Sequence, residues 1–245
     1  MRYAAVTAGE FLDRPNRFIA RVRVAGAVET VHVKNTGRCR ELLIPGRRVY
    51  LADSANPFRK TRFDLIAVEK PRPGREPLLI NMDSQLPNAA AEEFLRSGKL
   101  FPGVTALRRE VTFGDSRLDF YLEHAGRKVF LEVKGVTLET DGVAMFPDAP
   151  TARGVKHLHE LTAAVAQGYD AVLLLVIQMR GVTVFRPNDA MDPEFGAALR
   201  AATAAGVRIA AVDCLVTPDA VELDSPVPAD LSPSVPQTRG GKDHA

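Results

Sequence analysis

The chain has 245 residues, of which 46% are hydrophobic and 25% are charged, as is usual for a globular protein of one large or two small domains. No stretch approaches the roughly 18 consecutive apolar residues of a membrane span, and the N-terminal residues lack the apolar core of a secretory signal. The two cysteines, Cys39 and Cys214, are far apart and outside any metal-ligand spacing. We therefore expect a protein of the reducing cytoplasm with no membrane partner.

Charge is distributed unevenly along the chain. Residues 1–80 contain 16 lysines and arginines against 8 acidic residues, whereas the remainder contains 16 against 22. A basic half next to an acidic half is typical of a module that binds a polyanion joined to one that binds cations. The alternative is that these charges merely solvate the surface.

The first part of the chain, residues 1–82, is expected to form a small β-barrel. Apolar and polar residues alternate in short runs separated by turns, and no helix is apparent. An OB-fold is the favoured barrel because it suits this length and binds nucleic acids. The expected strands are 17–25, 28–33, 49–52, 63–68 and 77–82.

Residues 83–224 are expected to form a second, mixed α/β domain. A helix is predicted over 87–97, with Asn88 as its N-cap, followed by three strands and a loop over 135–150. Thr151 is predicted to cap a second helix, Asp192-Pro193 to start a third, and the run 171–177 to be a strand buried on both faces. Further strands are expected at 105–113, 117–123, 128–134, 182–185 and 207–212. The proline-rich residues 225–245 are expected to be a disordered tail.

Three residues on neighbouring strands could carry out chemistry. Glu132 and Lys134 are two apart on a strand and so share a face, and Asp119 is on the strand before them. Two carboxylates and a main-chain carbonyl form a hard oxygen site suited to Mg²⁺ or Mn²⁺, and a neighbouring lysine can orient an attacking water. These groups suffice for phosphodiester hydrolysis. The motif is weak, because an acid two residues before a lysine also occurs by chance on solvated strands.

Other polar residues near these strands leave two interpretations open. Glu92 or Glu93, on the preceding helix, could add a carboxylate to the metal or could be an exposed acidic pair. Gln178 could contact a substrate, or could simply mark the end of the buried strand.

The second helix carries His157 and His159, which diverge by about 200° and so cannot easily share a zinc ion. Arg153, Lys156 and His157 are instead interpreted as a cationic edge near a phosphate, or as ordinary surface residues.

The predicted barrel has two basic segments that could bind a nucleic-acid backbone. Asn35-Thr-Gly37-Arg38 follows a strand, and its backbone donors together with Arg38 and Arg40 could hold a phosphate. The second basic segment is Arg59-Lys60-Thr-Arg62, in which Lys60 and Arg62 could contact phosphates. Nearby aromatic residues could stack on bases, although core packing is their more usual role; they are Tyr3, Tyr50, Phe58 and Phe63.

The sequence resembles the sugar fermentation stimulation protein A (SfsA) family up to about residue 224. The most distinctive run lies between Met145 and Glu160. The matching segments are Asn35-Thr-Gly37, Leu43-Ile-Pro-Gly46, Arg59-Lys60, Asn81, Pro87-Asn88, Glu110-Val111, Ser116-Arg-Leu-Asp119-Phe120, Glu132-Val-Lys134, Thr137-Leu138, Met145-Phe-Pro-Asp148-Ala149, Thr151, Arg153-Gly154, Lys156-His157-Leu158 and Glu160-Leu161.

This resemblance implies an OB-like domain followed by a PD-(D/E)xK nuclease-like domain, and a DNA-binding function. It places Asp119, Glu132 and Lys134 at metal and catalytic positions and favours Glu92 as the helix acid. Two residues depart from the family's pattern: Ala152 stands where an acid is usual, and Cys39 stands where a methionine is common.

Two functions are therefore expected to compete. The first is a DNA nuclease that uses Mg²⁺ or Mn²⁺ at Asp119, Glu132 and Glu92, with nucleic acid bound by Asn35, Arg38, Lys60, Arg62, Arg153 and Lys156. The second is a DNA-binding regulator of sugar-utilisation genes that does not cleave. A metabolic binding protein ranks far behind both. Strandedness, DNA against RNA, and oligomeric state stay open.

Overall fold

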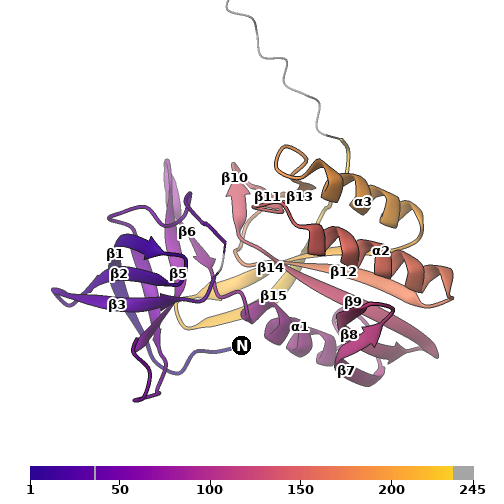
Figure 1. Ribbon diagram of the computed structural model, residues 1–245, viewed down its shortest axis with the longest axis horizontal. Helices are drawn as coiled ribbons and strands as arrows, with labels where there is room; N and C mark the ends of the chain where they lie inside the picture. Colours follow the sequence, from indigo (N-terminus) through magenta and orange to yellow (C-terminus); the bar gives the residue numbers. More distant parts are fainter. Residues whose placement is uncertain (36, 234–245) are drawn as a thin grey trace, which may run out of the picture.

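The computed structural model describes residues 1–35 and 37–233. The first part of the chain forms a six-stranded sheet in the order β3-β2-β1-β4-β5-β6, and β3 also pairs in parallel with β5. This extra pairing closes strands β1 to β5 into a small barrel, as an OB-fold requires (Figure 1). The strands are β1 (Val6–Asn16), β2 (Ile19–Val24), β3 (Ala27–Val33), β4 (Arg48–Asp53), β5 (Phe63–Arg72) and β6 (Arg75–Asn81).

Strand β1 is the barrel element that the sequence did not predict. Only Phe11 is buried along it, so no clear apolar alternation marks it, and it contains Gly9 and Pro15, which usually weaken strands. The glycine allows a close approach: a Cβ at Gly9 would lie 2.5 Å from Cγ1 of Val22 on β2. Closure of the barrel therefore depends on a residue whose local preference argues against a strand.

The second part of the chain is a six-stranded mixed sheet covered by helices on both faces. Its strand order is β15-β14-β12-β9-β8-β7, with β12 parallel to both β9 and β14. The strands are β7 (Val104–Phe113), β8 (Ser116–His124), β9 (Arg127–Val136), β12 (Asp170–Ile177), β14 (Arg208–Thr217) and β15 (Ala220–Val227). The helices are α1 (Leu86–Arg96), α2 (Ala152–Ala166) and α3 (Pro193–Ala204). No helix in residues 1–35 or 37–233 is long and apolar enough to span a membrane.

The central strand β12 divides two cores by the alternation of its side chains. Leu174 and its even-numbered neighbours pack with α1, while Leu173 and Leu175 pack with α2 and α3 on the opposite face. Figure 1 shows α1 on one side of the sheet and α2 and α3 on the other. Strand β9 follows the same alternation, which directs Glu132 and Lys134 toward α2.

Three expectations about the second domain need correction. Residues 135–150 are not only a loop, because they contain β10 (Leu138–Thr140) and β11 (Val143–Phe146), and β11 pairs with β13 (Val184–Pro187). Asn88 is not the N-cap of α1, which is Gln85. The chain is also ordered beyond residue 225, since β15 continues to Val227 and Asp230 donates its backbone N–H to Phe185. Residues 234–245 of the expected tail lie outside the described residues.

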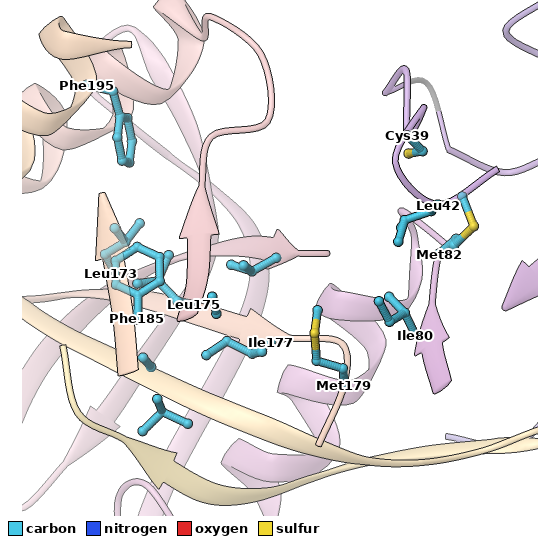
Figure 2. Packing of buried hydrophobic residues seen from close by; sticks show 14 of the residues in the cluster. Cys39, Leu42, Ile80, Met82, Leu173, Leu175, Ile177, Met179, Phe185 and Phe195 are labelled. Atoms are coloured by element: carbon cyan, nitrogen blue, oxygen red, sulfur yellow. The ribbon is translucent and has the colours of Figure 1, made fainter. Parts of the chain in front are cut away.

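The barrel and the sheet domain share one hydrophobic core. Figure 2 shows Met179, just after β12, between Ile177 and Ile80 at the end of β6, with Met82 and Leu42 beyond. The side-chain Nε2 of Gln178 donates to the main-chain oxygens of Asn81 and Asp83, at 3.2 and 3.1 Å. The N-terminus also crosses the expected boundary at residue 82, because Arg2 pairs with Ala220 of β15.

Candidate active site

Strand β9 brings Glu132 and Lys134 to the face of the sheet that α2 covers. Lys134 Nζ donates to Glu132 Oε1 at 2.7 Å, so the two side chains are in contact, as their spacing predicts. Their side chains are only 3% and 15% exposed. A buried carboxylate needs such partners, because desolvation of an unpaired charge costs several kcal/mol or more.

His157, on α2, is the second partner of Glu132. Its Nδ1 contacts Glu132 Oε1, and its Nε2 accepts a hydrogen bond of 3.3 Å from Arg153 Nε. Lys134 Nζ lies 3.1 Å from the same Nδ1, so Glu132, Lys134 and His157 form one cluster beneath α2. His157 was expected on a surface edge, but the residue is buried, whereas His159 on the same helix is exposed.

A sequence signal for His157 existed. Gly154, His157, Leu158 and Leu161 follow the three- and four-residue spacing of the buried side of α2. A polar residue within that stripe indicates a partner inside the protein.

Asp119 lies where β8 separates from β9. The two strands pair up to Phe120 and Leu131, and beyond that point Asp119 Oδ2 accepts the Val133 N–H at 2.8 Å. Its other oxygen accepts a 2.8 Å hydrogen bond from Nδ2 of Asn88, in the first turns of α1. Asn88, predicted as a helix cap, is thus a residue that positions the carboxylate of Asp119.

The two carboxylates have opposite acid–base behaviour. Burial and the charge of Glu132 raise the pKa of Asp119, and they outweigh the hydrogen bonds from Val133 and Asn88. Burial would also raise the pKa of Glu132, but the hydrogen bonds and charges of His157 and Lys134 hold it below its ordinary value. Glu132 is therefore ionised next to a second carboxylate whose charge is destabilised.

One oxygen of this pair has no partner. Glu132 Oε1 is shared by Lys134 and His157, while Glu132 Oε2 is buried with no hydrogen-bond partner among the described residues. A buried ionised oxygen without a donor is costly unless a cation or a ligand satisfies it.

Glu92 is not brought to this pair. Its carboxylate accepts hydrogen bonds from Arg96, one turn later on α1, and from Arg109 of β7, at 2.7 and 3.0 Å. The hydrogen bond from Arg96 and the charge of Arg109 hold the pKa of Glu92 below its ordinary value. In the described ranges no three side chains of His, Cys, Asp or Glu are grouped to hold a metal, and no contact joins Glu92 to Asp119 or Glu132.

The basic residues predicted to bind nucleic acid differ in whether they form ion pairs within the protein. Lys60 and Arg38 are exposed and make no ion pair with any described residue. Arg62 pairs with Asp53 at 2.8 Å. Of the aromatic residues considered, Phe58 is 95% exposed, whereas Tyr50 and Phe63 are buried.

The remaining predicted contacts lie at the start of α2 and at Asn35, just after β3. Arg153 is exposed and is tied to the site through His157, while Lys156 Nζ donates to the carbonyl of Asp115 at 2.8 Å. Asn35 has a structural role, because its side chain accepts from the Gly37 N–H and donates to the Met82 carbonyl, at 2.8 and 3.0 Å.

The fold and site together define a two-domain protein in which an OB barrel is joined to a mixed α/β domain containing a buried Asp–Glu–Lys cluster. Residues 12–76 match the family described as "SfsA N-terminal OB domain", and residues 85–220 match "Sugar fermentation stimulation protein RE domain". The chain belongs to the sugar fermentation stimulation protein (SfsA) family.

Similar proteins span nearly the whole chain. A sugar fermentation stimulation protein homolog of Desulfitobacterium hafniense is 53% identical over 91% of this chain and 95% of its own. The homolog of Ruminiclostridium cellulolyticum is 49% identical over 93% of this chain and 98% of its own. The structure of Pyrococcus furiosus SfsA in complex with Ca²⁺ has a TM-score of 0.80 at 29% identity, over 94% of this chain and 98% of that one.

Proposed function

We propose that this protein is a divalent-metal-dependent nuclease of the PD-(D/E)xK type that hydrolyses phosphodiester bonds in DNA. The observation that carries the proposal is the unpartnered, buried Oε2 of Glu132 beside Asp119. A divalent cation between the two carboxylates would satisfy that oxygen and offset their mutual repulsion.

The donor set fits a small hard cation. Mg²⁺ commonly binds through one or two carboxylates and completes its octahedron with waters and substrate phosphate oxygens, so two acids suffice without Glu92. The structure of Pyrococcus furiosus SfsA in complex with Ca²⁺ supports the proposal that this chain also binds a divalent cation. Mg²⁺ or Mn²⁺ is the proposed physiological ion, because each stabilises the compact charge of a phosphoryl transfer site.

When bound, the cation would supply Lewis-acid stabilisation of charge that develops on the phosphate. Asp119 and Glu132 would hold it, with Asn88 fixing one oxygen of Asp119 and His157 fixing one oxygen of Glu132. Lys134 Nζ, which donates a hydrogen bond to Glu132, would orient the attacking water and stabilise negative charge. Arg153 is exposed beside His157, where its guanidinium can contact a neighbouring phosphate.

The test is cleavage and binding measured on the same preparations. Labelled single-stranded and duplex DNA are incubated with wild type, Lys134→Ala and Asp119→Ala, with and without Mn²⁺. Lys134→Ala should lower the cleavage rate by roughly 10²–10⁴-fold, because it removes an electrostatic or acid–base group. DNA affinity should change little, and metal binding should persist because lysine is not a ligand.

Lys128→Ala is the matched control, since Lys128 is an exposed lysine on the same strand. It should cleave like the wild type. A regulator that binds DNA without cutting it predicts no metal-dependent cleavage by the wild type. Cleavage that persists undiminished in both Lys134→Ala and Asp119→Ala would identify a contaminating nuclease and overturn the proposal.

A further inference from the structure

A cavity of about 380 Å³ lies where the barrel meets the sheet domain. Its walls come from Asn35 and Gly37 of the barrel, the start of α1, the end of β9 and residues 146–151. This volume falls at the lower end of the range of about 300–1,000 Å³ usual for small-ligand sites. The cavity borders the candidate active site in the chain, because Pro87 precedes Asn88 and Gly135 follows Lys134.

The side chain of a buried residue presents an acceptor to this cavity that has no partner among the described residues. Gln178 is 2% exposed and lines the cavity, and three oxygens of Asn81 and Asp83 surround its Nε2. That environment fixes Oε1 as the free end of the amide, since no hydrogen bond to Oε1 exists within the described chain. A Cβ at Gly135 would lie 2.6 Å from this oxygen, so the glycine leaves it open.

The other wall residues indicate a flat ligand without negative charge. No lysine or arginine lines the cavity, whereas the exposed Asp148 does, so a phosphate would be repelled. Phe146 and three prolines give the cavity apolar surfaces. A planar group with N–H donors, such as a nucleobase, fits a site with apolar walls and fixed acceptors.

A second hollow of about 430 Å³ adjoins the first through Gly37, which lines both. The Arg14 guanidinium donates hydrogen bonds of 2.6–2.8 Å to four main-chain oxygens there and so holds this backbone in place. These oxygens belong to Arg17, Asn35, Gly37 and Arg38. Arg17, Arg38 and Arg40 line the same hollow, are exposed, and form no ion pair with any residue in the described ranges. These free cations suit the phosphates of a nucleic-acid backbone.

We infer that the two hollows together bind an unpaired strand of DNA, with one base in the interdomain cavity and the adjoining phosphates on Arg17, Arg38 and Arg40. This inference rests on the proposed function and narrows its substrate to single-stranded DNA or duplex with an unpaired end. A paired base could not enter the cavity, because its donors and acceptors are already engaged within the helix.

The experiment fills the cavity from two independent walls. Ala149→Phe and Thr137→Phe each add a ring to a half-buried residue that lines the cavity, and Ala201→Phe, on the exposed surface of α3, is the matched control. Binding is measured in EDTA, so that no cleavage occurs, to a single strand containing one 2-aminopurine and to a blunt duplex. Circular dichroism checks that each variant is folded, and the second filling variant serves if the first is not.

Both filling variants should bind the single strand about 10- to 100-fold more weakly, as expected for the loss of one stacked and hydrogen-bonded base. Their duplex affinity should match that of the control, and the 2-aminopurine fluorescence change seen with wild type should disappear. Arg38→Ala with Arg40→Ala should instead weaken both substrates and reduce the slope of log K against log salt by about 1.4 for the single strand.

Folded filling variants with unchanged single-strand affinity and fluorescence would overturn the inference. So would free deoxyadenosine that binds as tightly as the strand and is indifferent to Arg38 and Arg40, because the cavity would then be a small-molecule site. Failure of the nuclease proposal is distinguishable: a wild type that never cleaves but loses single-strand binding when the cavity is filled retains the strand site without the hydrolytic activity.

Discussion

At the scale of single residues, the candidate site depends on partners that satisfy a buried carboxylate. Glu132 is held by Lys134 from its own strand and by His157 from α2, and these contacts keep its pKa low despite burial. Burial and the charge of Glu132 raise the pKa of Asp119, which receives no hydrogen bond from a cationic side chain. The ionised form of Glu132 is therefore stabilised by its partners, whereas the ionised form of Asp119 is electrostatically unfavourable.

Replacement of His157 should reveal its contribution to this arrangement. His157→Leu keeps the buried volume but removes the hydrogen bond to an ionised carboxylate, so we expect a loss of about 1.5–3 kcal/mol in the free energy of unfolding. Urea denaturation near neutral pH measures it. His159→Leu, at an exposed position of the same helix, should stay within about 0.5 kcal/mol. Equal effects of the two substitutions would contradict the buried contact.

Removal of the strained charge should stabilise the metal-free protein. Because the pKa of Asp119 is raised in the fold, its ionised form opposes folding at pH values above that pKa, and Asp119→Asn should raise the melting temperature at neutral pH. Mn²⁺ at 100 times its dissociation constant should stabilise the wild type by about 2.7 kcal/mol, or several degrees, and should leave the variant nearly unchanged. Calorimetry with equal metal-dependent shifts would argue against Asp119 as a ligand.

At the scale of elements, one side chain couples the starts of two helices. Asp192 caps α3 by accepting the Phe195 N–H at 3.0 Å, and its other oxygen accepts the Thr151 N–H at 2.8 Å. Thr151 in turn caps α2 by accepting the Gly154 N–H. This chain of caps sets the start of the helix that carries Arg153 and His157.

Asp192→Ala should therefore cost more than Thr151→Ala. Loss of a single cap typically costs about 1 kcal/mol, which we expect for Thr151→Ala, whereas Asp192→Ala leaves donors of both helices unpaired and should cost about 2 kcal/mol or more. The free energies of unfolding of the two variants decide the matter. A smaller loss for Asp192→Ala would show that the helix starts are independent.

At the scale of the whole molecule, a buried ion pair links the two domains. Lys70 of β5 donates to the carboxylate and to the carbonyl of Glu139 on β10, both at 2.6 Å, and the Glu139 side chain is 5% exposed. Burial raises the pKa of Glu139, but Lys70 and the Gly142 N–H outweigh it and leave the pKa below its ordinary value. The pair therefore contributes to the contact between the barrel and the sheet domain.

Lys70→Met should cost about 3–5 kcal/mol, because it leaves a buried carboxylate without its counter-charge. The depressed pKa of Glu139 means that its stabilisation is complete above the unfolded pKa of about 4.3 and is lost as the pH falls through the lower folded value. Lys70→Met should consequently flatten the loss of stability between neutral and acidic pH. Arg2→Met, which breaks an exposed pair with Asp219, should cost at most about 1 kcal/mol.

Local pattern alone was sufficient for much of the secondary structure and for part of the site. Alternation with a period of two placed Glu132 and Lys134 on one face of a strand. Thr151 caps α2 as predicted, and α3 begins at Asp192-Pro193 as predicted. These features depend on residues only a few positions apart in the chain, so the local sequence is sufficient to predict them. Strand β1 was not predicted, because Gly9 is required by a close contact across the barrel and locally disfavours a strand.

Tertiary structure decided which distant side chains meet. His157 faces Glu132, Asn88 takes the position beside Asp119, and arginines neutralise Glu92, because these contacts depend on how α1 and α2 are rotated and shifted against the sheet. The cavity at Gln178 depends further on the docking of the barrel. The sequence by itself determined the elements and the face that carries the acids, while long-range packing determined their partners, since no local period encodes the distance between helices, sheet and barrel.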